Sequence, residues 1–271
     1  MSEALPDSET LRSVLDDACA AAARETLPRF RADTAVDNKL TAGFDPVTEA
    51  DRAAEAAIRR VIETRFPSHD IVGEEHGKVD KGSRFQWIID PIDGTRAFIS
   101  GIPVWGTLIG LYRNDIPLAG VLAQPFTRER FVALPDGGGK AAWLHLAKEE
   151  PKRLKTRRTV ELAQATLMTT SPDLLQSTAD KPYFKVEEKA KLVRYGCDCY
   201  AYAMIAAGQI DLVLESGLNI YDIAALIPIV EGAGGLVTNW QGGSAAQGGQ
   251  ILAAANPAIH RAAMDVLNAP D

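Results

Sequence analysis

The chain has 271 residues, of which 46% are hydrophobic and 24% are charged. These proportions are typical of a globular protein with a sizeable core and argue against wholesale disorder. The formal net charge is −7 and no long block of Lys and Arg occurs, which argues against nucleic acid as a partner.

The first 72 residues predict two amphipathic helices and a short strand. Apolar residues recur at helical spacing over 8–27 and over 48–65, with Ser8 as the expected N-cap of the first helix. The apolar residues of 70–72 then predict a strand that leads to Glu74.

A second group of strands is predicted in the next part of the chain. The apolar run 85–89 has the pattern of a buried strand and ends at an acidic turn, 90–95. Turn residues separate the following apolar segments, so an antiparallel meander is expected. Its strands are predicted at 104–112, 118–124 and 130–134.

After about residue 145, strand-like and helix-like segments alternate, which indicates an α/β arrangement. We therefore expect two subdomains, an N-terminal α+β subdomain with the acidic turn (1–145) and a C-terminal α/β subdomain (146–271). In the second, strands are predicted at 165–170, 192–195, 210–215 and 250–255, and helices at 172–177, 198–207, 223–232 and 257–267.

Cys19, Cys197 and Cys199 are too few for a disulfide framework, and the cysteine pair 197/199 lacks a second pair to complete a zinc site. The N-terminus lacks a basic segment followed by an apolar run, and no stretch of about 18 apolar residues occurs. We therefore expect a cytoplasmic protein with no membrane partner.

The acidic turn carries the strongest chemical signal. Asp90 and Asp93 follow a buried strand directly, and two carboxylates this close repel each other unless a cation lies between them. Mg²⁺ prefers carboxylate, carbonyl and water oxygens, so the Ile92 carbonyl is a possible third ligand. Gly94 and Thr95 come next, where a helix start would offer N–H groups to a phosphate.

Taken alone, a segment of Asp, Pro and Gly residues is more often an ordinary turn than a metal site. Its surroundings favour a site. Glu74 follows another strand upstream, and Asp222 stands at the head of a helix of small residues downstream. A multi-metal site for phosphoryl transfer needs acidic residues from several strand or helix ends in this way.

Three blocks of the chain resemble the inositol monophosphatase family, a group of metal-dependent, lithium-sensitive phosphatases. They span 45–75, 87–98 and 215–235, in the family's order and at its spacings. The resemblance covers most of the chain. It implies a mixed α/β (α+β) fold, the layered α-β-α-β-α sandwich of this family, and assembly as a homodimer.

The resemblance also implies roles for individual residues. Two to three Mg²⁺ ions per site are expected, with Glu74, Asp90, the Ile92 carbonyl, Asp93 and Asp222 as their ligands. Gly94 and Thr95 correspond to a phosphate-binding turn. Thr95 paired with Asp45 is expected to activate water for direct in-line attack on phosphorus, with Glu74 beside them.

The segments 96–107 and 221–226 depart from the inositol enzymes and are similar to the histidinol-phosphate phosphatase branch. Histidinol phosphate carries an amine and an imidazole, so its pocket should offer carboxylates. Glu215 matches the family position that contacts the leaving group, although a solvated strand end is the alternative. Asp198 either faces the same groups or is a plain helix N-cap.

Arg194 either orients one of these acids or approaches the phosphate. The sequence thus predicts a Mg²⁺-dependent phosphomonoesterase acting on L-histidinol phosphate, a small phosphomonoester. Inositol-1-monophosphatase activity, a related sugar or nucleotide phosphatase, and a catalytically silent anion-binding scaffold are the alternatives. The residues expected to bind substrate are Asp93, Gly94, Thr95, Arg194, Asp198, Glu215 and Asp222.

Overall fold

The computed structural model describes residues 4–32, 36–38, 46–175 and 177–270. The elements of the first half are α1 (Ser8–Thr26), β1 (Val36–Asn38), β2 (Pro46–Thr48), α2 (Glu49–Arg65), β3 (Asp70–Gly73), β4 (Gly77–Val79), β5 (Phe85–Asp93), α3 (Thr95–Ile99), β6 (Gly106–Arg113), β7 (Ile116–Gln124), β8 (Glu129–Asp136), β9 (Gly139–Leu146) and β10 (Lys152–Arg153). Those of the second half are β11 (Thr166–Thr169), α4 (Pro182–Glu187), β12 (Leu192–Tyr195), α5 (Asp198–Ala206), β13 (Leu212–Leu218), α6 (Ile220–Ile223), α7 (Leu226–Gly232), β14 (Leu236–Asn239), β15 (Gly249–Ala254) and α8 (Pro257–Leu267).

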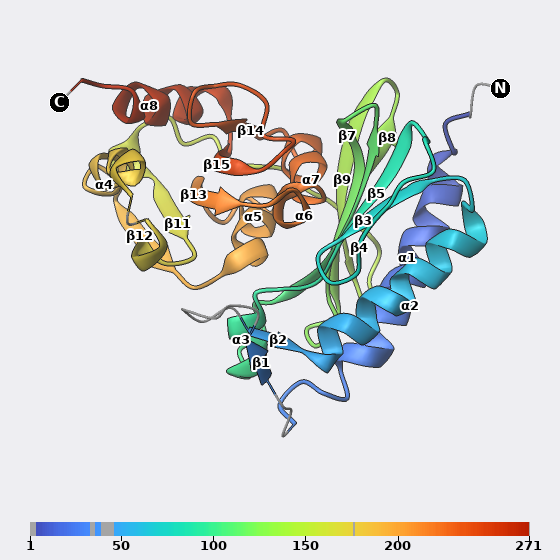
Figure 1. The fold of residues 1–271 in the computed structure, drawn as a ribbon. Coiled ribbons are helices and arrows are strands. Elements are labelled where there is room, and N and C mark those ends of the chain that lie inside the picture. The colour runs from blue at the N-terminus through green and yellow to red at the C-terminus, as the bar shows by residue number, and fades with distance from the viewer. Residues whose placement is uncertain (1–3, 33–35, 39–45, 176, 271) are drawn as a thin grey trace.

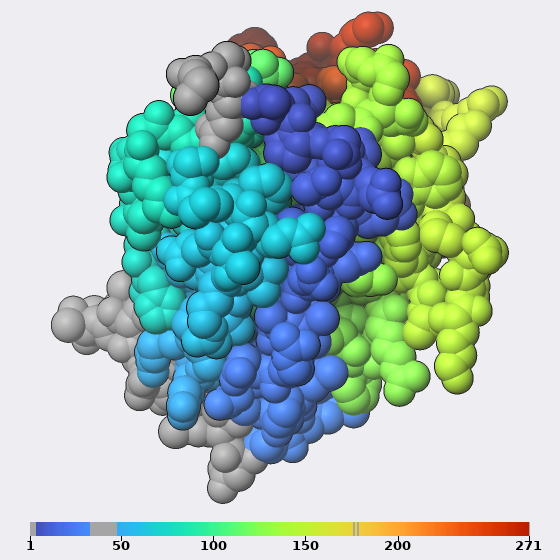
Figure 2. Space-filling view, turned by 90° about the vertical axis from the view of Figure 1, so that its right-hand side faces the viewer, coloured from blue at the N-terminus to red at the C-terminus, as the bar shows by residue number. Residues whose placement is uncertain are grey.

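The described elements stack in five layers (Figure 1). Helices α1 and α2 lie side by side and cover the outer face of the first sheet, as Figure 2 also shows. Helices α5, α6 and α7 lie between the two sheets, and α4 and α8 cover the outer face of the second. The α-β-α-β-α sandwich expected from the sequence is confirmed.

Within the described residues, the first sheet has the strand order β10-β9-β8-β7-β6-β5-β3-β4 and the second has β12-β11-β13-β15-β14. The predicted antiparallel meander is present as β6, β7 and β8. It continues into β9, a strand that the sequence reading missed. Strand β3 pairs parallel with β5, so the ends of both strands meet at the same edge of the sheet.

Three predicted helix features differ from the structure. The N-cap of α1 is Asp7, whose carboxylate accepts the Thr10 N–H at 2.7 Å, while the Ser8 hydroxyl donates to the Pro135 carbonyl at 2.8 Å. The segment 172–177 forms a short 3₁₀ turn at Pro172–Leu174 rather than a helix of its full length.

The helix predicted at 223–232 is divided into α6 and α7. Pro228 explains the division, because proline has no N–H and a helix running through it would lose the bond to residue 224. In the structure Pro228 stands in the first turn of α7, where N–H groups have no partner within the helix.

A large hydrophobic cluster joins the first sheet to the second half of the chain, and Leu108, Leu122 and Phe131 belong to it. The helices between the two sheets approach the first sheet closely. A Cβ on Gly110 would lie only 2.9 Å from the Ala224 carbonyl carbon. The division into 1–145 and 146–271 stays a prediction. No helix in the described part of the chain combines the length and apolar character needed to cross a bilayer.

Candidate active site

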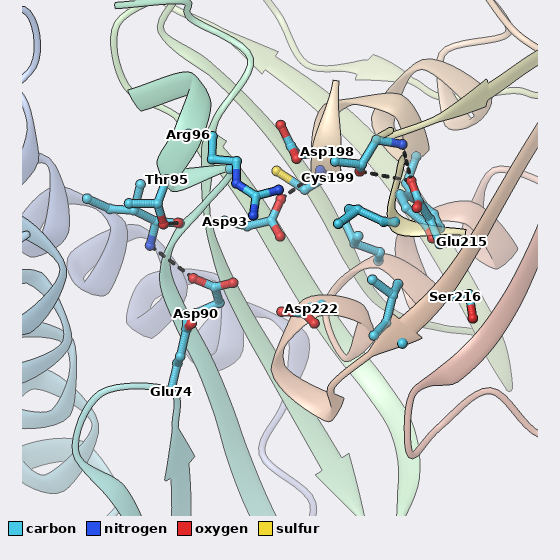
Figure 3. Close-up of a pocket in the computed structure, with 18 residues that line it drawn as sticks. Glu74, Asp90, Asp93, Thr95, Arg96, Asp198, Cys199, Glu215, Ser216 and Asp222 are labelled. Atoms are coloured by element: carbon cyan, nitrogen blue, oxygen red, sulfur yellow. Dashed lines mark hydrogen bonds between the residues drawn. The ribbon is translucent and has the colours of Figure 1, made fainter. Parts of the chain in front are cut away.

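A cavity of about 340 Å³ opens where the end of β5 meets α5, α6 and β13 (Figure 3). Both halves of the chain contribute to it. The residues around it are Glu74, Asp90, Ile92, Asp93, Gly94, Thr95, Arg96, Thr170, Leu174, Asp198, Cys199, Tyr202, Glu215, Ser216, Gly217, Leu218, Asp222 and Leu226.

The acidic turn is an extension of β5. This strand continues to Asp93 instead of ending at residue 89, and its pairing with β6 shifts register between Asp90 and Asp93. The shift leaves the intervening backbone outside the regular ladder and re-aims the side chains, as bulges do. The Thr107 hydroxyl holds this backbone by donating to the Pro91 carbonyl at 2.8 Å.

Two further hydrogen bonds define the turn. The Ile92 N–H donates to Asp90 Oδ1 at 3.0 Å, and the Thr95 hydroxyl donates to the Ile92 carbonyl at 3.1 Å. Gly94 has φ +82°, a left-handed conformation that glycine adopts without strain. Thr95 therefore begins α3 directly above the acidic turn.

Asp90, Asp93 and Asp222 form what we call the aspartate cluster. Each offers a carboxylate oxygen, and these oxygens all lie within 4.8 Å of one another. Burial raises the pKa of Asp90 well above its ordinary value, and repulsion from Glu74, Asp93 and Asp222 raises it further. Such a group of hard oxygen donors fits a divalent cation, which would remove the repulsion.

Glu74 reaches the aspartate cluster from β3. Its N–H donates to the Ile89 carbonyl at 3.2 Å, which continues the pairing of β3 with β5. Its side chain lines the cavity next to Asp90 (Figure 3), and its charge raises the pKa of Asp90. The parallel pairing of the two strands thus accounts for the meeting of Glu74 with the turn.

Glu215 lies on the far wall of the cavity, on β13 (Figure 3). Its side chain accepts hydrogen bonds from the Thr170 N–H at 2.6 Å, the Thr170 hydroxyl at 2.9 Å and the Thr169 hydroxyl at 3.0 Å. The residue is only 4% exposed, and burial raises its pKa to about 7 although these hydrogen bonds oppose the rise. The alternative of a solvated strand end is therefore wrong.

Asp198 is the first residue of α5 and has φ +41°, a conformation rarely adopted by residues with a Cβ. The N-cap is Cys197, without a side-chain capping bond, so the plain N-cap interpretation of Asp198 is wrong. A Cβ on Gly94 would lie 3.1 Å from Asp198 Oδ2, so the turn and this carboxylate approach closely. Burial raises the pKa of Asp198, while the Thr170 hydroxyl and Arg96 oppose the rise.

A hydrogen bond joins the near wall of the cavity, formed by the acidic turn, to the far wall, formed by α5 and β13. The Cys199 N–H donates to Asp93 Oδ2 at 2.7 Å, across 106 positions of the chain. Cys19, Cys197 and Cys199 all lie in the described residues and form no disulfide. Backbone donors at a helix start leave no sequence signature, so this contact was not predictable.

Several residues of the cavity were missed by the sequence analysis. Arg96 follows Thr95 directly, and its position beside the turn was the one available signal for it. Thr170 and Tyr202 carried no signal, because a threonine after a strand and a tyrosine in an apolar helix are common. The Tyr202 hydroxyl is buried and has no hydrogen-bond partner among the described residues.

Asp51 was also missed. It is 1% exposed in the first turn of α2, where its carboxylate accepts the Thr48 N–H at 2.8 Å and the Thr48 hydroxyl at 2.6 Å. Burial raises its pKa to about 6, and the charges of Glu75 and Glu74 add to the rise. Its sequence pattern is that of a helix capping box, which conceals any second role.

Two predicted site residues are not part of this assembly. Arg194 is exposed on β12 and does not line the cavity. Its contact with substrate stays a prediction. Asp45 lies outside the described residues, and its pairing with Thr95 also stays a prediction.

The buried carboxylate of Glu215 gives a testable pH dependence. Its pKa rises on folding from an ordinary value of 4.5 to about 7, so its contribution to stability is present below about pH 4.5 and is lost as the pH rises through 7. At one pKa unit per 1.36 kcal/mol, the loss is roughly 3 kcal/mol. Urea unfolding of the metal-free protein at pH 5, 6 and 7 measures it.

The Glu215→Gln variant isolates this contribution from the other titrating groups. Because glutamine does not titrate, the free energy of unfolding of the unsubstituted protein should fall relative to the variant between pH 5 and 7. A difference that stays constant over this range would show that the carboxyl does not change its pKa on folding.

The family model described as "Inositol monophosphatase family" matches residues 7–269. The chain is 41% identical over 235 residues to the "Bifunctional phosphatase IMPL2, chloroplastic" of Arabidopsis thaliana, which spans 83% of this chain and 66% of that protein. It is 32% identical over 246 residues to the "Histidinol-phosphatase" of Mycobacterium tuberculosis, covering 90% of this chain and 92% of that one.

A solved structure of an inositol monophosphatase from Zymomonas mobilis superposes with a TM-score of 0.84 at 35% identity, covering 98% of this chain and 100% of that one. The family is generally metal-dependent, which agrees with the aspartate cluster. These matches indicate a phosphatase, that is, a phosphoric monoester hydrolase. The chain belongs to the inositol monophosphatase family.

Proposed function

We propose that the chain is a Mg²⁺-dependent phosphomonoesterase that hydrolyses L-histidinol phosphate to L-histidinol and phosphate, a step of histidine biosynthesis. The observation that carries the proposal is a pair of carboxylates, the buried Glu215 and the half-buried Asp198, in the same cavity as the aspartate cluster. A phosphate bound at the cluster would leave the rest of the substrate facing these two acids. Carboxylates in that position favour a cationic leaving group.

The aspartate cluster, Glu74 and the Ile92 carbonyl are the proposed ligands of two to three Mg²⁺ ions. All are hard oxygen donors, and the donors of the cluster repel one another strongly when no cation is bound. Bound Mg²⁺ supplies Lewis-acid polarisation of the phosphoryl oxygens and compensates the charge that develops on them.

The chain's own groups orient the phosphate and the water. The N–H groups in the first turn of α3 are suited to phosphate oxygens, because the first turn of a helix leaves such groups without internal partners. The Thr95 hydroxyl donates to the Ile92 carbonyl, so its oxygen lone pairs are available to accept a hydrogen bond from a water molecule. Water held there would attack phosphorus in line with the leaving oxygen.

A proton acceptor is needed next to that water. Asp45 is the predicted partner of Thr95. Among the described residues, Asp51 is buried near Glu74 and its carboxylate accepts the Thr48 N–H and hydroxyl, but it does not line the cavity and so does not lie beside that water.

The candidate substrates differ in their leaving groups, so the residues that face the leaving group determine substrate preference. The amine of histidinol phosphate is cationic at neutral pH, and pairing with Glu215 would offset the burial that raises the pKa of this acid. Inositol 1-phosphate is the second candidate, supported by the similarity to the Zymomonas mobilis inositol monophosphatase structure. A homodimer in the cytoplasm is proposed on the family resemblance and the sequence alone.

The test is phosphate release from three substrates, histidinol phosphate, inositol 1-phosphate and 3′,5′-adenosine bisphosphate, each with Mg²⁺ and with a chelator. We expect the highest kcat/KM with histidinol phosphate and loss of activity in the chelator. Equal or better turnover of inositol 1-phosphate would refute the substrate assignment. Activity that persists in the chelator would refute the role of the metal.

A further inference from the structure

Glu55 is a charged residue of α2 with its side chain completely buried outside the cavity. Its carboxylate accepts the Glu75 N–H at 2.6 Å and the His76 N–H at 3.2 Å. Both donors belong to the turn between β3 and β4, directly after Glu74. The carboxylate therefore binds the backbone that carries a proposed metal ligand.

Arg59 completes this contact. Its Nε donates to Glu55 Oε1 at 2.7 Å, one helical turn further along α2, and its guanidinium also donates to the Gly77 carbonyl. The pair thus forms hydrogen bonds with three backbone groups of the turn, at Glu75, His76 and Gly77. These three residues follow Glu74 directly, and the last of them is the first residue of β4.

The end of β3 is shaped to accept the carboxylate. A Cβ on Gly73 would overlap the Glu55 carboxyl group, so a side chain at this position would displace the carboxylate from the turn. Glycine is required here by close approach, because its backbone has no positive φ. The carboxylate is thus packed against the residue immediately before Glu74.

A buried ion pair adds little net stability compared with apolar residues of similar volume, because desolvation of the charges offsets their attraction. An apolar side chain at position 55 could fill the same space. It could not accept the two N–H groups of the turn, and two unpaired buried donors would then favour a rearranged backbone. Charge at this position therefore acts on the geometry of the turn more than on the total stability.

We propose that Glu55, held by Arg59, is a positioning residue that keeps the Glu74 carboxylate against Asp90 and so sets the affinity of the site for divalent cations. The inference rests on the proposed metal centre and extends it to residues that touch neither the cavity nor the substrate. Groups that orient metal ligands in this way typically change metal affinity by about 10- to 100-fold when they are altered.

The test compares divalent cation binding by the unsubstituted protein, Glu55→Gln and Glu63→Gln. Glu63 is exposed on the same helix and serves as the matched control. Free Mn²⁺ is measured by electron paramagnetic resonance during titration of the metal-free proteins, without substrate, and Mg²⁺ binding by calorimetry. We expect a Kd raised about 10-fold in Glu55→Gln and unchanged in Glu63→Gln.

Kinetics provide the second measurement. The Mg²⁺ concentration for half-maximal phosphate release should rise in Glu55→Gln, while kcat at saturating Mg²⁺ stays within about twofold, since the altered residue touches no reacting atom. Arg59→Lys, which keeps a positive charge, should show the same change to a smaller extent. If Glu55→Gln does not fold, Arg59→Lys carries the same two measurements.

An unchanged Kd in a folded Glu55→Gln, or a loss of kcat that high Mg²⁺ does not restore, would overturn the inference. Failure of the metal proposal looks different. In that case the unsubstituted protein itself would bind no Mn²⁺ or would stay active in the chelator, whereas failure of the positioning role alone leaves its binding intact.

Discussion

Asp93→Asn is expected to lower kcat/KM for phosphate release by about 10²- to 10³-fold, the range seen when one charge-stabilising group is removed from a catalytic centre. Asp93 belongs to the aspartate cluster and lies next to the turn that would bind phosphate. Asparagine has the same shape, and its carbonyl oxygen can still accept the Cys199 N–H that joins the two walls. The loss should therefore reflect charge rather than folding.

Thermal unfolding of the metal-free proteins separates these two explanations. Burial and the charges of Asp198 and Asp222 raise the pKa of Asp93, so removing its charge should leave the midpoint equal or higher than in the unsubstituted protein. Asp265→Asn, at an exposed position of α8, is the control and should keep full activity. Full activity in Asp93→Asn would exclude Asp93 from the metal site.

Glu215→Gln is expected to lower kcat/KM for histidinol phosphate by about 10- to 100-fold and to affect inositol 1-phosphate much less. A buried hydrogen bond to a charged group contributes roughly 1.5–3 kcal/mol, which corresponds to that factor. The amide keeps an oxygen for the Thr170 N–H, and the Thr169 hydroxyl can accept from the amide nitrogen, so the local packing is retained.

The ratio of kcat/KM for the two substrates is the informative quantity, since a general disturbance of the site would lower both values together. Glu188→Gln, at the exposed C-cap of α4 outside the cavity, serves as the control. Equal losses with both substrates would show that Glu215 does not recognise the cationic part of histidinol phosphate.

Local patterns predicted the acidic turn and most helices. Asp90, Asp93, Gly94 and Thr95 lie in six consecutive residues, so their proximity required no knowledge of the fold. The apolar periodicity of α1 and α2 likewise reports the side that packs on the first sheet. The prediction was wrong where one residue opposed an otherwise helical pattern. Pro228 does so between residues 223 and 232, where α6 and α7 are separate helices.

The burial and contacts of the residues on the far wall of the cavity could not be predicted from local sequence patterns. Glu215 was named from its place in a family block, yet its hydrogen bonds come from Thr169, the last residue of the neighbouring strand β11, and from Thr170 directly after it. Asp198 reads like an ordinary helix start, and only its left-handed backbone and its contact with the turn distinguish it.

Glu55 illustrates the same limit within a regular helix. Its spacing from Asp51 places both acids on one side of α2, but an acid in a charged helix is usually solvated. Its burial becomes evident only when the β3–β4 turn lies over it.

The chemistry proposed for the acidic turn follows from local sequence, because Asp90, Asp93 and the proposed phosphate-binding residues are contiguous and their residue types prefer Mg²⁺ and phosphate. Which acids are buried, in which direction their pKa values shift and which backbone groups bind them depend on the tertiary structure. Those properties depend on desolvation and on hydrogen bonds between segments up to 106 positions apart, such as Cys199 to Asp93, and no local pattern of residues encodes such distances.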